Sequence, residues 1–452
     1  MSKLVIAKNP DLSFLTTNVS KTTSKEYTLP IIITDGSLDW DANGFITFYS
    51  GGPNVYNIKP SFETVQKKSY KLNLFCSFLY KNNTRYHQIN DSTLYQFTLE
   101  LKKRKVNDST IKSYIVTALE FVVYLNKEYP SWNLATSDEV TDKSYKVHYE
   151  VKKVIRGYRN KEYLSHSCLN GLINISTEIH FLHDDEFEKW LDAINVTSLH
   201  PIKDDFIVER WYAFGTLLEV TGSRISEVDQ ITRSMIKEAS KDLFNPNSIH
   251  YIKNIPIKKG KYKGNKRTIK ITKEDLQIIL NYILKVEEKF KDITHDFIFV
   301  DLMNGKKLTL SYLKNYARKV INNSPYEKVL KHINNHSFRH RFITLQIARE
   351  IKRLSKYGSF ANIISVASEA CRKITMHAST NSLSSYVHLA TTLNEKNSYN
   401  DECFSELSSQ TRIRILNLKD ISTSFKNNLI NEKEALDRII SEIDLIKTPN
   451  VI

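Results

Sequence analysis

Two arginines that are far apart in the chain stand in contexts that could hold a phosphate group. The first is Arg224, in 221-TGSRISEV-228. Gly222 can end one helix and Ser223 or a neighbour can start the next. Arg224 would then lie at a helix N-terminus, where its guanidinium fork adds to a dipole that favours anions. Glu227 is three residues further on and could orient the arginine. Alone, such a pair is more often a surface ion pair.

The second arginine lies in 336-HSFRHRFIT-344. On a helix His336, Arg339 and His340 would share one face, while Phe338 and Phe342 would turn toward the core. An imidazole that exchanges protons near neutral pH would then stand beside a second phosphate-binding fork. The alternative is a solvated basic face. A metal site is less favoured, because the Glu of an HExxH motif is missing and the arginine would repel a cation.

A candidate nucleophile follows in 374-ITMHASTNSLSSYVHL-389, where His377 precedes Tyr386 across a bend rich in Ser, Thr and Asn. A phenol has an ordinary pKa of about 10 and is a poor nucleophile at neutral pH. It becomes reactive where cations stabilise the phenolate and a base takes its proton. The chain has 24 tyrosines, and the alternative for any one of them is a half-buried packing residue. Tyr386 is therefore a candidate only if the other segments lie near it.

A basic hairpin is predicted in 253-KNIPIKKGKYKGNKRTIKI-271. A turn at Gly264-Asn265 would project Lys263 toward a DNA groove. Lysine suits the protonation of a departing 5′-hydroxyl, because it is a compact donor whose pKa drops in a cationic site. The alternative is simple contact with phosphates. We expect that role for the remaining cations of the hairpin, which are Lys258, Lys259, Lys261, Lys266 and Arg267.

The elements that must position these residues begin with a small β-containing extension at 1–57. Two β-type runs, at 29–34 and 44–49, flank a turn-rich segment. The stretch 58–180 is expected to be a helical domain, because apolar residues recur there at helical spacing. Its last part is less clear, and we expect the segment KVHYEVKKVIRGYRN at 146–160 to form a further helix.

Residues 181–400 are expected to form a second domain, mainly helical, with the hairpin near 249–271 as its β element. Its first helix is predicted at 182–194, where acidic residues suit a helix N-terminus. The predicted fold class is thus mainly α with a small β-sheet or hairpin, in two domains that follow the N-terminal extension.

A helical tail is expected at 401–452. It should end in an amphipathic helix at 431–446, where Asn431 and Glu434 have the spacing of a helix cap. Its apolar residues recur at helical spacing and would make one stripe. They are Leu436, Ile439, Ile440, Ile443 and Ile446.

Composition indicates a polyanionic partner. The 452 residues carry a formal charge of +15, and each Lys or Arg that approaches a phosphate releases condensed counterions. A merely basic surface is the alternative. The four cysteines are scattered singly, which predicts neither a disulfide framework nor a structural zinc site. The N-terminus has no signal-peptide core, and no run of about 18 apolar residues occurs. We therefore expect a soluble cytoplasmic protein that is associated with the nucleoid through DNA.

Together these segments resemble the tyrosine recombinase (phage integrase) family. TGSRISE is similar to that family's TGLRISE-type box, and HSFRH to its H-x-L/F-R-H box. His377 and Tyr386, followed by VHL, have the family's spacing from LGH to the tyrosine. KGNKRTIKI resembles the family's hairpin and would place the catalytic lysine at Lys263. DSTIKSYIVTALEFVVYL, which opens at Asp108, resembles the helical core-binding domain.

The resemblance covers roughly residues 60 to 390, and its specific motifs lie after 220. The chain departs from the pattern at Met376, where the family usually has Gly, and at Ser382-Leu383, which replaces a common Thr-Thr pair. These departures remove no reacting group, but they leave the placement of the third-box histidine open. The first 57 residues, which could be an arm-type DNA-binding module, and the tail beyond about 400 match nothing in the family.

The resemblance implies a site-specific DNA recombinase of a mobile element, acting in integration or transposition. Arg224 and Arg339 would clamp the scissile phosphate, with His336 and His377 beside it, and Tyr386 would attack to give a 3′-phosphotyrosyl link. Lys263 would protonate the departing 5′-hydroxyl, and Glu227 and His340 would support the site. The link conserves phosphodiester energy, so the resemblance implies no metal, ATP or other cofactor.

The resemblance also implies partners: duplex recombination sites, a homotetramer formed through the C-terminal tail, and accessory DNA-bending proteins. For the stripe on the tail, packing on its own domain is an equal alternative. A type IB topoisomerase-like nicking-closing enzyme, or a catalytically silent DNA-binding protein, remains an alternative function. A metal-dependent nuclease is a more distant one.

Overall fold

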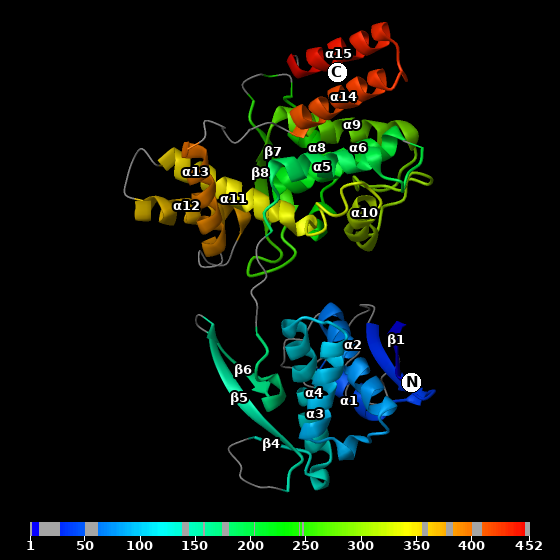
Figure 1. Cartoon of the computed structure of the whole chain (residues 1–452), viewed down its shortest axis with the longest axis vertical. Coiled ribbons are helices and arrows are strands. Elements are labelled where there is room, and N and C mark those ends of the chain that lie inside the picture. Colours follow the sequence, from blue (N-terminus) through cyan, green and yellow to red (C-terminus); the bar gives the residue numbers. More distant parts are fainter. Residues whose placement is uncertain are drawn as a thin grey trace. The chain divides into compact units, whose positions relative to one another are not determined.

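The structure, a computed structural model, describes residues 2–8, 28–49, 62–137, 144–156, 159–173, 180–202, 204–243, 245, 248–354, 360–376, 383–399 and 409–447. The chain divides into two compact units, Met1–Thr177 and Glu178–Ile452, each considered by itself (Figure 1). Both are mainly helical with small antiparallel or mixed sheets, which confirms the predicted fold class. No helix in the described ranges combines the length and the apolar character needed to cross a membrane.

The first unit is built on helices packed around one core. That core includes Leu72, Phe75, Phe97 and Phe121. The elements in chain order are β1 (Ser2–Lys8), β2 (Thr28–Thr34), β3 (Ser37–Leu38), α1 (Trp40–Tyr49), α2 (Phe62–Lys81), α3 (Asp91–Lys103), α4 (Asp108–Glu128), β4 (Ala135–Ser137), β5 (Val147–Arg156) and β6 (Arg159–Ser165).

The β-type run predicted at 29–34 is confirmed as β2, but the one at 44–49 is wrong, because it lies in α1. Phe45 and Ile46 bury a helical stripe in the core of the unit, one turn after Ala42. Asp39 caps the helix, since its Oδ1 accepts the backbone N–H of Ala42 at 3.1 Å. A short apolar run such as this one is compatible with either a helix or a strand, and its tertiary contacts decide.

The helix predicted at 146–160 is also wrong, because the segment forms β5, which pairs antiparallel with β6 and parallel with β4. Val147 is buried and Tyr149 packs against the same core, so alternate residues of β5 face the helices. The backbone hydrogen bonds of β5 are made with β4 and β6. The periodicity of residues 146–160 alone could not reveal these partners.

The described part of the N-terminal extension shares the core of the first unit. Leu29, Ile32, Phe45 and Ile46 belong to the same buried cluster as the helices α2 to α4. The predicted boundary at residue 57 lies outside the described residues and stays a prediction. The division between the units falls at 177/178, close to the boundary predicted at 180.

The second unit is a helical body that carries one hairpin. Trp190 stacks on Trp211 with ring centroids 3.9 Å apart, and Phe338 meets Trp190 edge-on at 4.9 Å, in the middle of its core. Its elements are α5 (Asp184–Val196), α6 (Asp205–Thr221), α7 (Ile225–Val228), α8 (Arg233–Ala239), β7 (His250–Pro256), β8 (Lys266–Ile271), α9 (Lys273–Lys289), α10 (Leu310–Asn322), α11 (Asn335–Leu354), α12 (Phe360–Thr375), α13 (Ser384–Tyr399), α14 (Ser409–Lys426) and α15 (Glu432–Lys447). The predicted first helix and hairpin are confirmed as α5 and β7–β8.

The C-terminal tail forms two helices, and the amphipathic helix predicted at 431–446 is confirmed as α15. Asn431 Oδ1 accepts the backbone N–H of Glu434 at 2.9 Å, as the capping spacing predicted. α14 is held to α5 by buried Arg412, which bonds Glu188 at 3.1 Å. On α15 three residues of the predicted stripe, Leu436, Ile440 and Ile443, are exposed, while Ile439 is half-buried. The helix α15 itself contacts α14 of the same unit, and both predicted roles of the stripe stay predictions.

Candidate active site

Arg224 is presented by the junction between α6 and α7. Gly222 ends α6 in the left-handed conformation with φ 52°, and Arg224 is the N-cap residue of α7. A Cβ on Gly222 would lie 2.4 Å from the ring of Phe342, so this position needs glycine for space as well as for φ. Arg224 Nη1 donates to Glu227 Oε1 at 3.1 Å, and the Arg224 backbone N–H donates to Oε2 of the same carboxylate. The predicted helix end at Gly222, the position of Arg224 at the next helix N-terminus and its contact with Glu227 are confirmed.

The helix α11 brings His336, Arg339 and His340 to one region, while Phe338 and Phe342 are buried in the core as expected. The rings of His336 and His340 meet edge-to-face with centroids 4.5 Å apart. Figure 1 shows α11 crossing the unit beside α12 and α13, and both helices contact it. The predicted shared face is therefore present in the folded chain.

Arg339 is the buried cation of the site, with 2% of its surface exposed. Its Nη1 donates to the carbonyl of Gly222 at 2.8 Å, and its Nη2 donates to the carbonyl of Thr375 at 3.2 Å. These two bonds fix the guanidinium between the end of α6 and the end of α12. Arg339 is thereby oriented by Gly222 and Thr375, which are 117 and 36 positions away in the sequence.

Arg267 lies in the site and not on the DNA-facing surface predicted for it. Only 5% of its surface is exposed. Its Nη2 donates to Ser223 Oγ at 2.6 Å and approaches Glu227 Oε2 at 3.5 Å. Alternation along β8 explains this, because Arg267, Ile269 and Ile271 all point inward. The same alternation was available in the sequence and would have placed Arg267 on the buried face.

Positive charge exceeds negative charge at this junction. The guanidinium groups of Arg224 and Arg267 pair with one carboxylate, that of Glu227, which is 1% exposed and also attracts the buried guanidinium of Arg339. Burial first, and then repulsion by Arg224 and Arg267, lowers the pKa of Arg339 to about 10. Burial and repulsion by Arg224 likewise lower the pKa of Arg267, against the attraction of Glu227. Such an imbalance fits a site that receives an anion.

The hydroxyl of Tyr386 lies at this cluster. Tyr386 is 8% exposed in the first turns of α13, and its Oη is 2.7 Å from His340 Nδ1. Burial raises the pKa of the Tyr386 phenol, while Arg339 and Arg224 both act to lower it. Arginines from two distant segments thus act on one phenol, which is the convergence on which the sequence interpretation depended.

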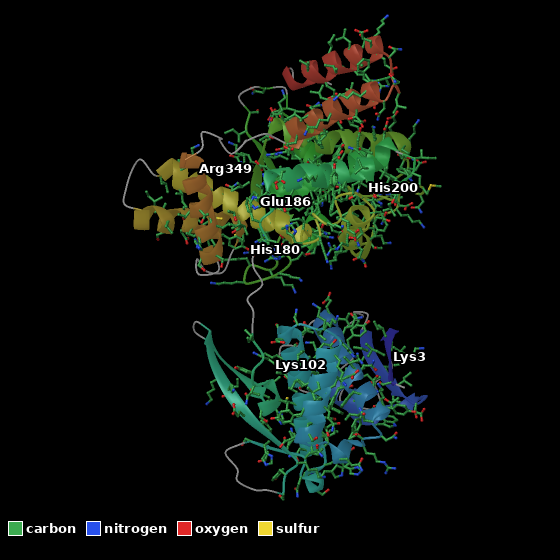
Figure 2. All side chains as sticks on the ribbon, in the orientation of Figure 1. Lys3, Lys102, His180, Glu186, His200 and Arg349 are labelled. Carbon is green, nitrogen blue, oxygen red and sulfur yellow. The ribbon has the colours of Figure 1, made fainter. Side chains whose placement is uncertain are left out.

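His340 faces the phenol as a neutral imidazole. Burial, followed by the charges of His336, Arg339 and His180, lowers the pKa of His340 to about 4 (His180 is labelled in Figure 2). Burial, followed by Arg339 and Arg224, also lowers the pKa of His336. Both imidazoles are therefore neutral at pH 7, and His340 Nδ1 can accept from the phenol.

Replacing His340 with glutamine should reduce the loss of folding stability that occurs when the pH is lowered. Between pH 6.5 and about 4 the unfolded His340 binds a proton that the folded side chain does not. Because the unfolded state binds more protons there, stability falls as the pH falls. We expect the melting temperature of His340→Gln to drop less than that of wild type across this window. The exposed His388→Gln serves as control, and equal slopes for wild type and His340→Gln would contradict the expectation.

The predicted general acid, Lys263, is exposed in the turn between β7 and β8. This turn is tethered, because Arg372 of α12 donates to Tyr262 Oη at 3.1 Å. The strand β8 that follows the turn carries Arg267 into the cluster. The lysines expected to contact DNA, which are Lys258, Lys259, Lys261 and Lys266, are exposed along the same hairpin.

His377 lies outside the described residues, so its place in the site stays a prediction. The residue before it is described: Met376 ends α12 with φ 55°. This left-handed conformation is one that glycine adopts readily and that costs other residues about 1 kcal/mol or more. The departure from the family's glycine is therefore a local strain, directly after the Thr375 carbonyl that holds Arg339.

No protein-family model matches the sequence, and no curated protein matches it. Among solved structures, the chain is similar to XerA recombinase at 17% identity with a TM-score of 0.33, covering 80% of this chain and 99% of that one. It is also similar to the Tn1549 transposon integrase in complex with transposon right end DNA, at 16% identity and a TM-score of 0.42, with the same coverage. Likenesses this distant do not establish a reaction, so function is inferred from the side chains.

Proposed function

We propose that this protein is a site-specific DNA recombinase that cuts and rejoins DNA through a 3′-phosphotyrosyl intermediate with Tyr386 as nucleophile. One observation carries the proposal. The Tyr386 hydroxyl is 2.7 Å from a neutral imidazole and lies within the influence of Arg224 and Arg339, where cations outnumber carboxylates. A phenol placed in this way is suited to attack a phosphodiester.

Each group has a chemical role in the proposed step. Arg224 and Arg339 bind the non-bridging oxygens of the scissile phosphate, while Glu227 holds Arg224. The phenol proton passes toward His340 as the bond between Tyr386 Oη and phosphorus forms. The bond from phosphorus to the 5′-oxygen breaks, and Lys263 protonates that oxygen. His336, together with His377, hydrogen-bonds the phosphate. The reverse steps, with a 5′-hydroxyl of a partner strand, restore the phosphodiester.

Arg267 is a positioning residue in this proposal. It is buried beneath Ser223 and Glu227, next to Arg224, and its bond to Ser223 ties β8 to the α6–α7 junction. Its Nε and Nη1 have no hydrogen-bond partner among the described atoms. The hairpin thereby braces the α6–α7 junction that carries Arg224, and Lys263 lies in its turn.

The proposal extends to partners. The Tn1549 integrase structures contain DNA, and a charge of +15 suits a duplex partner here. We propose that both units contact recombination sites of a mobile element, with accessory DNA-bending proteins. Strand exchange between two duplexes requires four protomers. The exposed stripe on α15, including Leu436 and Ile440, supports a contact of the tail with a neighbouring protomer in a homotetramer.

A nicked suicide duplex tests the reaction. The duplex carries the end of the encoding element and loses the 5′-hydroxyl strand after cleavage, so the intermediate accumulates. We expect a covalent protein–DNA adduct that survives denaturant and forms in EDTA. Failure to form an adduct on any such end would refute the proposal. Relaxation of supercoiled plasmids that lack the site would instead favour a topoisomerase-like nicking-closing enzyme, which would use the same catalytic groups.

A further inference from the structure

The turn between β7 and β8 is closed by its own backbone hydrogen bonds. The N–H of Ile257 donates to the carbonyl of Asn265 at 2.9 Å, and the N–H of Gly264 donates to the carbonyl of Ile257 at 2.9 Å. Gly264 has a φ of 95°, which glycine adopts without strain. These bonds fix the shape of the turn, but its position relative to the arginine cluster depends on contacts with other elements.

Tyr262 joins the turn to α12. Its side chain is half-buried, whereas its neighbours Lys261 and Lys263 are exposed. Arg372 Nη1 donates to Tyr262 Oη at 3.1 Å. The guanidinium is itself fixed, because its Nε and Nη2 donate to the two carboxylate oxygens of Glu369 at 2.7 and 2.6 Å. The phenol of Tyr262 therefore meets a donor whose orientation is set by α12.

The same end of α12 holds an arginine of the site. Thr375 lies one turn after Arg372, and its carbonyl accepts from Arg339 Nη2 at 3.2 Å. One helix end thus contacts both the turn, through Tyr262, and the buried guanidinium of the site. A displacement of the turn relative to α12 is therefore a displacement relative to Arg339.

Lys263 lies in the sequence between two attachments of the hairpin to the site. Tyr262, directly before it, bonds α12, and Arg267, four residues after it, donates to Ser223 at 2.6 Å. A lysine side chain is long and flexible, so its ammonium is placed only as well as its backbone is. The alternative role for the Tyr262 bond is stability alone, but a partly exposed hydrogen bond contributes little to folding because water replaces it.

We propose that the hydrogen bond between Tyr262 and Arg372 positions Lys263 for protonation of the departing 5′-oxygen. The inference rests on the proposed function and adds α12 to it. As the bond from phosphorus to the 5′-oxygen breaks, its electron pair stays on that oxygen. The ammonium of Lys263 gives this oxygen a proton and becomes a neutral amine. Tyr262 and Arg372 exchange no proton with the DNA, so they are positioning residues.

A suicide duplex with a 5′-bridging phosphorothiolate separates the acid from the other catalytic groups. Sulfur replaces the departing oxygen, and a thiolate leaves without protonation because thiols are far more acidic than alcohols. Single-turnover cleavage of this duplex and of the ordinary one is measured with full-length protein in excess. On the ordinary duplex we expect Tyr262→Phe and Arg372→Gln to cleave about 10- to 100-fold more slowly than wild type, which is part of the 10² to 10⁴-fold that a positioned acid contributes. On the phosphorothiolate both variants, and Lys263→Ala, should cleave at rates close to wild type.

Tyr251→Phe is the matched control, because Tyr251 is exposed on β7 of the same hairpin, and it should cleave both duplexes like wild type. The double variant Tyr262→Phe/Arg372→Gln should be no slower than either single variant, because both changes remove one bond. Arg372→Gln keeps the phenol, so a defect in this variant excludes Tyr262 itself as the proton donor. All these variants should melt close to wild type.

A wild-type rate for Tyr262→Phe on the ordinary duplex would overturn the inference, and so would a defect equally large on the phosphorothiolate. A defect of Lys263→Ala that sulfur does not relieve would overturn it too, because the acid would then be another group. If the wild type forms no adduct with either duplex, the proposed function fails, and the inference fails with it.

Discussion

Replacing Tyr386 with phenylalanine should abolish the covalent protein–DNA adduct while leaving DNA affinity and the melting temperature close to wild type. The substitution removes only the hydroxyl that lies 2.7 Å from His340 Nδ1. A ring without this oxygen cannot form a phosphotyrosyl bond, so the loss should be complete. Denaturing gel electrophoresis of the suicide-substrate reaction measures the adduct directly, and an equilibrium binding assay on the same duplex measures affinity.

Tyr316 provides a matched control in the same unit. It is 6% exposed, and its hydroxyl is 2.8 Å from His200 Nε2, so Tyr316→Phe also removes one buried tyrosine–histidine contact. We expect Tyr316→Phe to form the adduct at the wild-type rate wherever it is folded. An adduct that persisted in Tyr386→Phe would show that another residue is the nucleophile, and the assignment would fail.

Replacing Arg339 with alanine should lower the single-turnover cleavage rate by about 10² to 10³-fold, the typical cost of losing one donor that stabilises transition-state charge. Arg339 is held between the carbonyls of Gly222 and Thr375 and is repelled by Arg224 and Arg267. An anion that entered this cluster would relieve the repulsion. The rate is measured on the suicide substrate with protein in excess over DNA.

The stability of Arg339→Ala has to be measured beside its rate. Two buried carbonyls lose a donor, at a cost of roughly 1–3 kcal/mol each, while the removal of a repelled cation offsets part of that loss. The rate is therefore measured at a temperature at which circular dichroism shows that the variant is folded. Arg353→Ala, an exposed change on the same helix that breaks only the pair with Glu350, should cleave at the wild-type rate. Equal rates for Arg339→Ala and Arg353→Ala would remove Arg339 from the proposed site.

Sulfate offers a second readout that does not depend on catalysis. If the three arginines receive a phosphate, sulfate should raise the melting temperature of the wild type more than that of Arg339→Ala, because a ligand that binds only the folded state stabilises it. Chloride at equal ionic strength controls for screening. The same shift in both proteins would indicate that the buried charge is not an anion site.

The sequence by itself determined the features that depend on local spacing. Gly222 ends a helix and leaves Arg224 at the next N-terminus, because a left-handed residue and a capping pair act within a few positions. His336, Arg339 and His340 share a face because the helical repeat places them there. The β7–β8 hairpin and the cap of α15 follow from turn and capping residues in the same way.

Only the tertiary structure decided which of these pieces meet and how their charges act on one another. Arg267 turned inward to Ser223, β5 found its partner in β6, and residues 44–49 became a helix against the core of the first unit. The phenol of Tyr386 met His340, 46 positions away. Strand pairing and pKa depend on groups that are distant in sequence, since backbone partners, burial and nearby charges are supplied by whatever the fold brings into contact.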